Sequence, residues 1–134
     1  MPKLVLFLLF ILFFAGCGET VQLTPEVRKA ADKYLTFLAR DEYQAVWLSS
    51  ASIFKEVVSA DAWREQMKAS REKLGKAKTR NQRDAISQIN PSNHPPGEYI
   101  LINFDTGFER DEAVETLILY KEEVDWRLAG YFIK

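Results

Sequence analysis

Cysteine and histidine are almost absent from this chain of 134 residues, which contains one of each. A single cysteine excludes a disulfide bond within the chain, whatever compartment it occupies. The lone histidine, His94, lies in a proline-rich stretch, and without nitrogen or sulfur partners a zinc site would need carboxylates alone. Glycine-rich phosphate loops are also missing, and one loop histidine does not support a Ser-His-Asp triad. We therefore expect no catalytic residue, no metal and no cofactor.

An excess of one charge is missing as well. The chain has 18 basic and 19 acidic residues, and removal of residues 1–16 takes away Lys3 alone, which leaves 17 basic and 19 acidic. This balance is typical of proteins that do not bind nucleic acid. A long apolar run is also absent. The longest, Leu4 to Phe14, would form a helix of about 16 Å, whereas a bilayer core requires about 20 residues. Its length fits the hydrophobic segment of a signal peptide.

The residues around Cys17 indicate a bacterial lipoprotein signal. Lys3 supplies the positive start, the apolar run follows, and the small residues Ala15 and Gly16 precede Cys17. We expect cleavage before Cys17 and acylation of its sulfur and of the new amino terminus, with several acyl chains giving a stable membrane anchor. The alternatives are an uncut anchor helix beside an unmodified Cys17, and a buried core cysteine, which the flanking glycines disfavour.

This signal predicts the organisation of the chain. Residues 1–16 form the signal peptide, residues 17–23 a lipidated tether, and residues 24–134 one α+β domain. The protein is expected to be exported and held in the cell envelope by its N-terminal lipid. Gly18 follows the cysteine where an aspartate would indicate retention in the inner membrane, so we expect the outer membrane, facing the periplasm.

The first half of the domain has helical patterns. Thr24 and Pro25 form a helix start, a shorter helix is expected from Glu42 to about Ser50, and a third follows the N-cap Ser59 and ends at Gly75. Apolar side chains at helical spacing, or in the connection between the second and third helices, are expected to pack inward: Val27, Ala31, Tyr34, Leu35, Leu38, Tyr43, Val46, Trp47, Ile53, Phe54, Val57, Val58, Trp63, Met67 and Leu74.

The second half predicts four strands, at about 77–89, 98–108, 113–120 and 126–133, with a loop at 90–97. Short turns between the last three make them antiparallel neighbours. Helices followed by a strand meander indicate an α+β fold with the helices on one face of the sheet. Both faces of the last two strands carry apolar residues. Either the sheet curls around its core, or a second copy covers the outer face and forms a homodimer.

Charge is unevenly distributed along the domain. Residues 68–83 are basic and residues 105–125 are acidic. One interpretation is a basic patch for anionic lipid or an acidic ligand. The interpretation that we favour is pairing between neighbouring strands and between strand and helix.

Several motifs together resemble one family: Trp47, Phe54-Lys55, Trp63, Arg71, Leu74-Gly75, Arg80, Gly97-Glu98-Tyr99, Phe104, Phe108, Glu115 and the ending Trp126-Arg127-Leu128-Ala129-Gly130-Tyr131-Phe132-Ile133. Over roughly residues 27–133 the chain resembles the domain-of-unknown-function 4019 (DUF4019) family. The resemblance implies a bacterial, often lipid-anchored protein with a cystatin-like or NTF2-like α+β cone, and it implies no catalytic residues. The turn Glu123-Val124-Asp125 stands where many members have Asp-Gly.

Two functions follow from these observations. The favoured one is a noncatalytic envelope lipoprotein that binds an unknown protein, peptide or lipid partner. The alternative is a cone-fold enzyme or carrier for a small hydrophobic ligand, with Glu115 or Asp105 as a pocket carboxylate beside Tyr99. Residues that could line a ligand pocket, or form an ordinary structural cluster, are Trp47, Trp63, Arg71, Arg80, Tyr99, Glu115, Trp126 and Tyr131.

Overall fold

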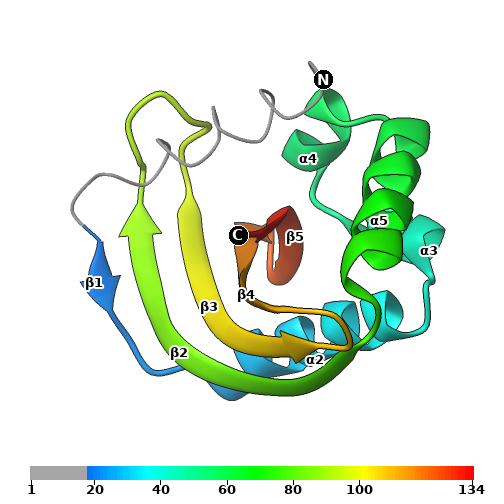
Figure 1. The fold of residues 1–134 in the computed structure, drawn as a ribbon. Coiled ribbons are helices and arrows are strands. Elements are labelled where there is room, and N and C mark those ends of the chain that lie inside the picture. Colours follow the sequence, from blue (N-terminus) through cyan, green and yellow to red (C-terminus); the bar gives the residue numbers. More distant parts are fainter. Residues whose placement is uncertain (1–17) are drawn as a thin grey trace.

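A computed structural model describes residues 18–134, so the predicted signal peptide and Cys17 lie outside the described residues. Within this described range, four helices and five strands follow one another (Figure 1). Their bounds are β1 Glu19–Thr20, α2 Pro25–Ala39, α3 Tyr43–Ser49, α4 Ser52–Val57, α5 Ala60–Leu74, β2 Ala77–Ile89, β3 Glu98–Phe108, β4 Glu112–Glu122 and β5 Asp125–Ile133. Among residues 18–134, no helix is long and apolar enough to cross a membrane.

The two long helices begin and end where their sequence signals indicate. The Thr24 side chain accepts a hydrogen bond from the Val27 amide at the start of α2, and Ser59 accepts one from the Ala62 amide at the start of α5. Each cap satisfies one of the amide groups that a helix leaves unpaired at its first turn. Gly75 ends α5 with φ of 80°, a conformation that glycine adopts without steric cost. The first and third predicted helices are therefore confirmed, and α3 at Tyr43–Ser49 confirms the second.

The connection between α3 and α5 forms a helix of its own, α4. Phe54 is buried there as predicted, but Val57 is 69% exposed, and its prediction as a core residue is wrong. Helical spacing places Val57 near the face of Phe54, but Val57 is the last residue of α4 and the main core does not extend to it. The Ala51 amide donates to the carbonyl of Leu128 at 2.8 Å and joins this region to β5.

The sheet has the order β1-β2-β3-β4-β5, and all neighbours are antiparallel. The α+β class and the meander from β2 to β5 are thus confirmed, whereas the predicted count of four strands is wrong. The additional strand, β1, pairs Glu19 with Ser87 and Thr20 with Ile86, inside the segment predicted to be a tether. Two residues are too few to show the alternation by which strands are recognised in a sequence.

The sheet is strongly curved, with the helices α3, α4 and α5 on the side away from β1 (Figure 1). Its inner face and the helices enclose the main core, which includes Tyr34, Trp63, Ile102, Leu117 and Leu128. A second cluster on the other face buries Tyr99, Leu101, Ile118 and Ala129, with Ile53, Ile86, Tyr120 and Phe132 packed against it. The curvature and this second cluster account for apolar residues on both faces of β4 and β5. The sheet-face homodimer stays a prediction.

Candidate functional site

Glu115 is the one charged side chain among residues 18–134 that is completely buried. It lies on the inner face of β4, opposite Phe104 of β3 and two positions before Leu117. The alternation of β4 directs these side chains into the main core. A carboxylate in such surroundings has a large desolvation cost unless it is paired and hydrogen-bonded.

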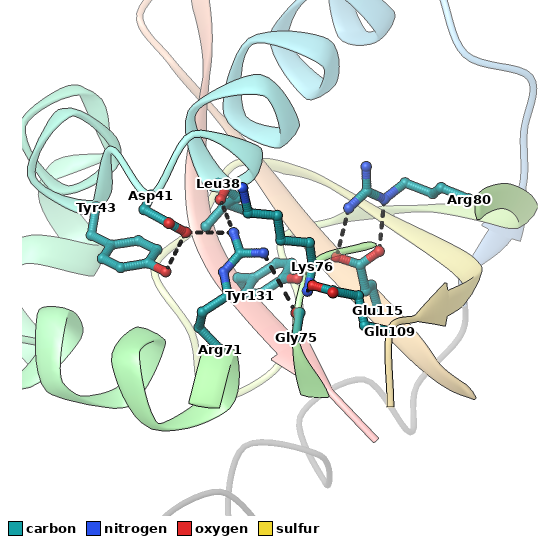
Figure 2. A network of polar contacts seen from close by, with 10 residues as sticks. All are labelled: Leu38, Asp41, Tyr43, Arg71, Gly75, Lys76, Arg80, Glu109, Glu115 and Tyr131. Atoms are coloured by element: carbon teal, nitrogen blue, oxygen red, sulfur yellow. Dashed lines mark hydrogen bonds and ion pairs between the residues drawn. The ribbon is translucent and has the colours of Figure 1, made fainter. Parts of the chain in front are cut away.

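Four hydrogen bonds supply that compensation. Arg80 donates from Nε to Oε1 at 2.7 Å and from Nη2 to Oε2 at 3.2 Å, so that the guanidinium and the carboxylate meet as two forks (Figure 2). The Thr106 hydroxyl donates to Oε1, and the Tyr131 hydroxyl donates to Oε2. A carboxylate offers about four acceptor positions, so these donors occupy the full capacity of Glu115.

The Tyr131 hydroxyl remains a donor over the whole range of ordinary pH. Its burial, together with the negative charge and the hydrogen bond of Glu115, raises the pKa of Tyr131 well above its usual value of 10. The ring is held by the edge of Trp63, with centroids 6.4 Å apart and planes at 80°. Trp63 is itself fixed, because its indole N–H donates to the carbonyl of Tyr43 at 2.9 Å.

A second polar cluster lies beside the first and is centred on Arg71, in the last turn of α5. Its guanidinium donates to the carbonyl of Leu38 at 2.8 Å and forms an ion pair with Asp41 at 2.5 Å (Figure 2). Tyr43 donates its hydroxyl to the same carboxylate at 2.8 Å. Partial burial raises the pKa of Asp41, but the Tyr43 hydrogen bond and the charge of Arg71 outweigh it and lower the pKa. Arg71 therefore joins α5 to the turn between α2 and α3.

The space between the two clusters is a small cavity of about 40 Å³, lined among others by Met67, Arg71, Arg80, Glu115 and Tyr131. One water molecule requires about 10–15 Å³ measured in this way, so the cavity has room for a few water molecules. Pockets that bind small organic ligands typically have about 300–1,000 Å³. The carboxylate is thus enclosed by its protein partners, and within residues 18–134 the cavity that it lines is smaller than a substrate-sized pocket.

Comparison with known proteins matches the main part of this domain. The family model described as "Protein of unknown function (DUF4019)" matches residues 30–131, from α2 to Tyr131 in β5. This chain belongs to the DUF4019 family. No significant match was found among curated proteins or among solved structures.

The structure of this DUF4019 domain brings four of the predicted pocket residues around one cavity: Arg71, Arg80, Glu115 and Tyr131. Trp63 contacts this group through Tyr131. Trp47 and Trp126 are half-buried and pack against the main core from other positions. The Trp47 indole N–H donates to the carbonyl of Val58 at 2.8 Å, away from Glu115.

Tyr99 and Asp105 lie apart from Glu115. Tyr99 belongs to the second cluster on the opposite face of the sheet, and its hydroxyl donates to the carbonyl of Pro95 at 2.7 Å. Asp105 is half-exposed and pairs with Arg83 at 2.5 Å. The structure therefore does not bring a second carboxylate or Tyr99 to Glu115, as a site for acid–base chemistry with these residues would require.

Sequence reasoning missed three polar partners in this DUF4019 chain, namely Thr106, Asp41 and Tyr43 in its polar role. A signal was available for Thr106, because it shares the inner face with the apolar residues Phe104 and Phe108, and a polar residue there needs a partner. No comparable signal existed for Asp41, whose contact with Arg71 joins positions 30 residues apart.

The basic segment 68–83 and the acidic segment 105–125 form two ion pairs between strands, in agreement with the interpretation favoured from the sequence. Arg83 on β2 pairs with Asp105 on β3, and Arg80 reaches across β3 to Glu115 on β4. Within residues 18–134, no three side chains of His, Cys, Asp or Glu gather as a metal site would require. His94 lies in the loop before β3, where partial burial lowers the pKa of its imidazole.

Proposed function

We propose that this DUF4019 chain is a lipid-anchored bacterial envelope protein whose domain binds a partner without catalysing a reaction. The observation that carries the proposal is the saturation of Glu115. A catalytic carboxylate needs a free oxygen within reach of a substrate proton, whereas both oxygens of Glu115 accept two hydrogen bonds each from Arg80, Thr106 and Tyr131. The small volume of the adjoining cavity supports the same function.

The anchor in this proposal is Cys17, acylated after removal of residues 1–16. The first described strand, β1, begins at Glu19, two positions after Cys17. A domain joined to its lipid by so few residues would lie close to the membrane surface, in the outer membrane and facing the periplasm. The helices and the curved antiparallel sheet are consistent with the cystatin-like or NTF2-like cone, which we include in the proposal as the fold type.

The anchor is tested with Cys17→Ser in the native bacterium. The variant should move from the membrane pellet to the soluble periplasmic fraction and lose incorporation of labelled palmitate, because serine offers no thiol for acylation. Glu19→Gln is the matched control, since it changes an exposed residue two positions away and keeps the thiol. A Cys17→Ser chain that still pellets with membranes, with no palmitate on the unchanged chain, would refute the anchor.

The binding role is tested by complementing a deletion strain with Glu115→Gln. A noncatalytic domain should complement at any substitution that leaves the amount of folded protein unchanged. Loss of complementation at normal protein level, together with unchanged cross-links to partners in intact cells, would instead assign a reaction to Glu115.

A further inference from the structure

Strand β2 has an edge that β1 covers at one end only. β2 runs from Ala77 to Ile89, but β1 pairs with Ser87 and Ile86, and the Val21 amide adds one hydrogen bond to the carbonyl of Ala85. From residue 77 to residue 84, β3 is the one strand that pairs with β2 within the described part of the chain. Figure 1 shows this curved half of β2 at the periphery of the sheet. An uncovered strand edge presents backbone N–H and C=O groups to an incoming chain.

A groove of about 680 Å³ lies along this edge, between α2 and β2. Its apolar lining comes from Leu23, Ala31, Leu35 and Phe104, and its polar lining on the strand side comes from Arg80 and Gln82. Irregular pairing between residues 77 and 79 and between 82 and 84 leaves a regular stretch from Thr79 to Gln82. The accessible edge is therefore about four residues long, and it borders a hollow that is apolar at its base.

The charges of the groove favour an acidic occupant. Arg28 on α2 and Arg40, the residue that caps the C-terminal end of α2, are exposed, while Asp32 is the one acidic residue of the lining. Arg80 adds a guanidinium, whose third nitrogen points away from Glu115 (Figure 2). Two exposed arginines on one wall can pair with carboxylates in the fork geometry that guanidinium groups favour.

We propose that the β2 edge from Thr79 to Gln82 and the adjoining groove bind an extended, acidic peptide segment of a partner protein as an added strand. This inference rests on the proposed binding function and names the chemistry of the partner. Backbone pairing with β2 would provide affinity, alternate side chains of the peptide would enter the apolar base of the groove, and its carboxylates would face Arg28 and Arg40.

A second copy of this chain fits the same edge less well. Antiparallel pairing of two β2 edges, centred between Arg80 and Asn81, would place Lys78 of each copy opposite Arg83 of the other. Like charges directly opposite each other destabilise a strand pair, and edge lysines are a common means of preventing such association. The carboxylates of an acidic peptide would instead lie opposite these basic side chains and attract them.

The charge requirement is tested with the full chain in detergent micelles and a dye-labelled, blocked heptapeptide of alternating Glu and Val. The peptide should bind saturably, and its counterpart of alternating Lys and Val should not. The double variant Arg28→Glu/Arg40→Glu should weaken binding by about tenfold or more. The matched control is Lys33→Glu/Arg64→Glu, which makes the same change of charge outside the groove and should leave affinity within about twofold. Equal binding of both peptides, or equal losses in both double variants, would overturn the proposal.

Strand addition is tested separately with two Glu/Val peptides that are N-methylated at alternate residues, one at odd and one at even positions. An added strand directs one set of amides to β2, so one peptide should lose binding and the other should keep it. Similar affinity for both methylated peptides would refute strand addition. Two further results would refute it. The first is that self-association of the chain displaces the peptide while excess peptide does not reverse the self-association. The second is that phosphatidylglycerol vesicles displace the peptide while excess peptide does not displace the vesicles.

A photo-crosslinker at Gln82, compared with one at Val124 in the distant β4–β5 turn, separates this inference from the proposed function. Partner cross-links at Val124 and none at Gln82, in cells where Cys17 is acylated, would refute the groove and leave the proposed function intact. Release of the chain from membranes with Cys17 unmodified would refute the anchor whatever the peptide does.

Discussion

The ion pair of Arg80 with the buried Glu115 predicts a measurable contribution of Arg80 to the free energy of unfolding. We expect Arg80→Met to lower the free energy of unfolding substantially, because it keeps most of the apolar side chain but removes the guanidinium from a completely buried carboxylate. Loss of one partner of a buried ion pair typically costs about 3–5 kcal/mol. The Arg80 side chain is 23% exposed, so water can reach the vacated position, and we expect a value near the lower limit, about 3 kcal/mol.

Arg83→Met is the matched control on the same strand. Arg83 also forks onto a carboxylate, that of Asp105, but both side chains are 52% exposed. Pairs in such positions contribute about 0–1 kcal/mol. Two arginines three positions apart, with similar partners, should therefore differ by about 2 kcal/mol or more, because one carboxylate is buried and the other is not.

The assay is urea unfolding of the full chain in detergent, followed by far-ultraviolet circular dichroism and by tryptophan fluorescence. In a separate thermal melt, Arg80→Met should lower the melting temperature by roughly 10–15 °C. In a double-mutant cycle with Glu115→Gln, the combined variant should be less destabilised than the sum of the two single variants, by about 2 kcal/mol. A loss below about 1 kcal/mol for Arg80→Met, or equal losses for Arg80→Met and Arg83→Met, would refute this reasoning.

Three further predictions follow from other residues. Burial raises the pKa of Tyr99 to about 12 and that of Tyr131 well above 10. The stability from their neutral hydroxyls is therefore complete below pH 10 and declines above it, for Tyr99 as pH rises through about 12. Tyr131→Phe should flatten this decline in unfolding free energy, and an unchanged alkaline profile would contradict the prediction. Trp63→Ala should cost about 3–5 kcal/mol and Trp126→Ala less, since Trp63 is fully buried and Trp126 half-buried; equal losses in urea unfolding would contradict this. Glu123 has φ of 58° in the β4–β5 turn, a conformation that costs less for glycine. Glu123→Gly should therefore raise the free energy of unfolding by about 0.5–1 kcal/mol and raise the melting temperature. A lower melting temperature would show that the turn is not strained there.

The long elements could be predicted because their signals are local. Thr24 and Ser59 are helix caps whose partners lie three residues ahead, and both were recognisable in the sequence. The strands β3 to β5 could be recognised as runs of β-forming residues separated by short polar turns. By contrast β1 depends on pairing with Ile86 and Ser87, more than 60 residues away, and carries no local pattern. Val57 fails for a related reason, since an apolar residue in a short helix is buried only if the tertiary contacts face it.

Some members of the candidate site could be predicted from the sequence, but their contacts with one another could not. Glu115 and Arg80 were both candidates, yet the sequence could not show that they pair with each other or that Thr106 and Tyr131 complete the carboxylate. These contacts connect the four strands β2 to β5 and depend on sheet register and on the irregular pairing of β2. The groove beside β2 was unpredictable for the same reason, because it arises from the distance between α2 and a strand that follows it by about 40 residues.

The brevity of β1 has a mechanical consequence if the chain is anchored at Cys17. A partner that pulls the domain away from the bilayer would load the polypeptide through Glu19 and Thr20, where β1 is fastened to the sheet by the shortest ladder in the fold. The pairing of β1 with β2 would break first, before α2 or the β2–β5 meander unfolds. Peeling would free residues 18–23 as a leash of about 20 Å and uncover the remaining margin of β2 as far as Ser87. Traction on the lipid would thereby lengthen the reach of the domain and enlarge the surface that it offers to a partner.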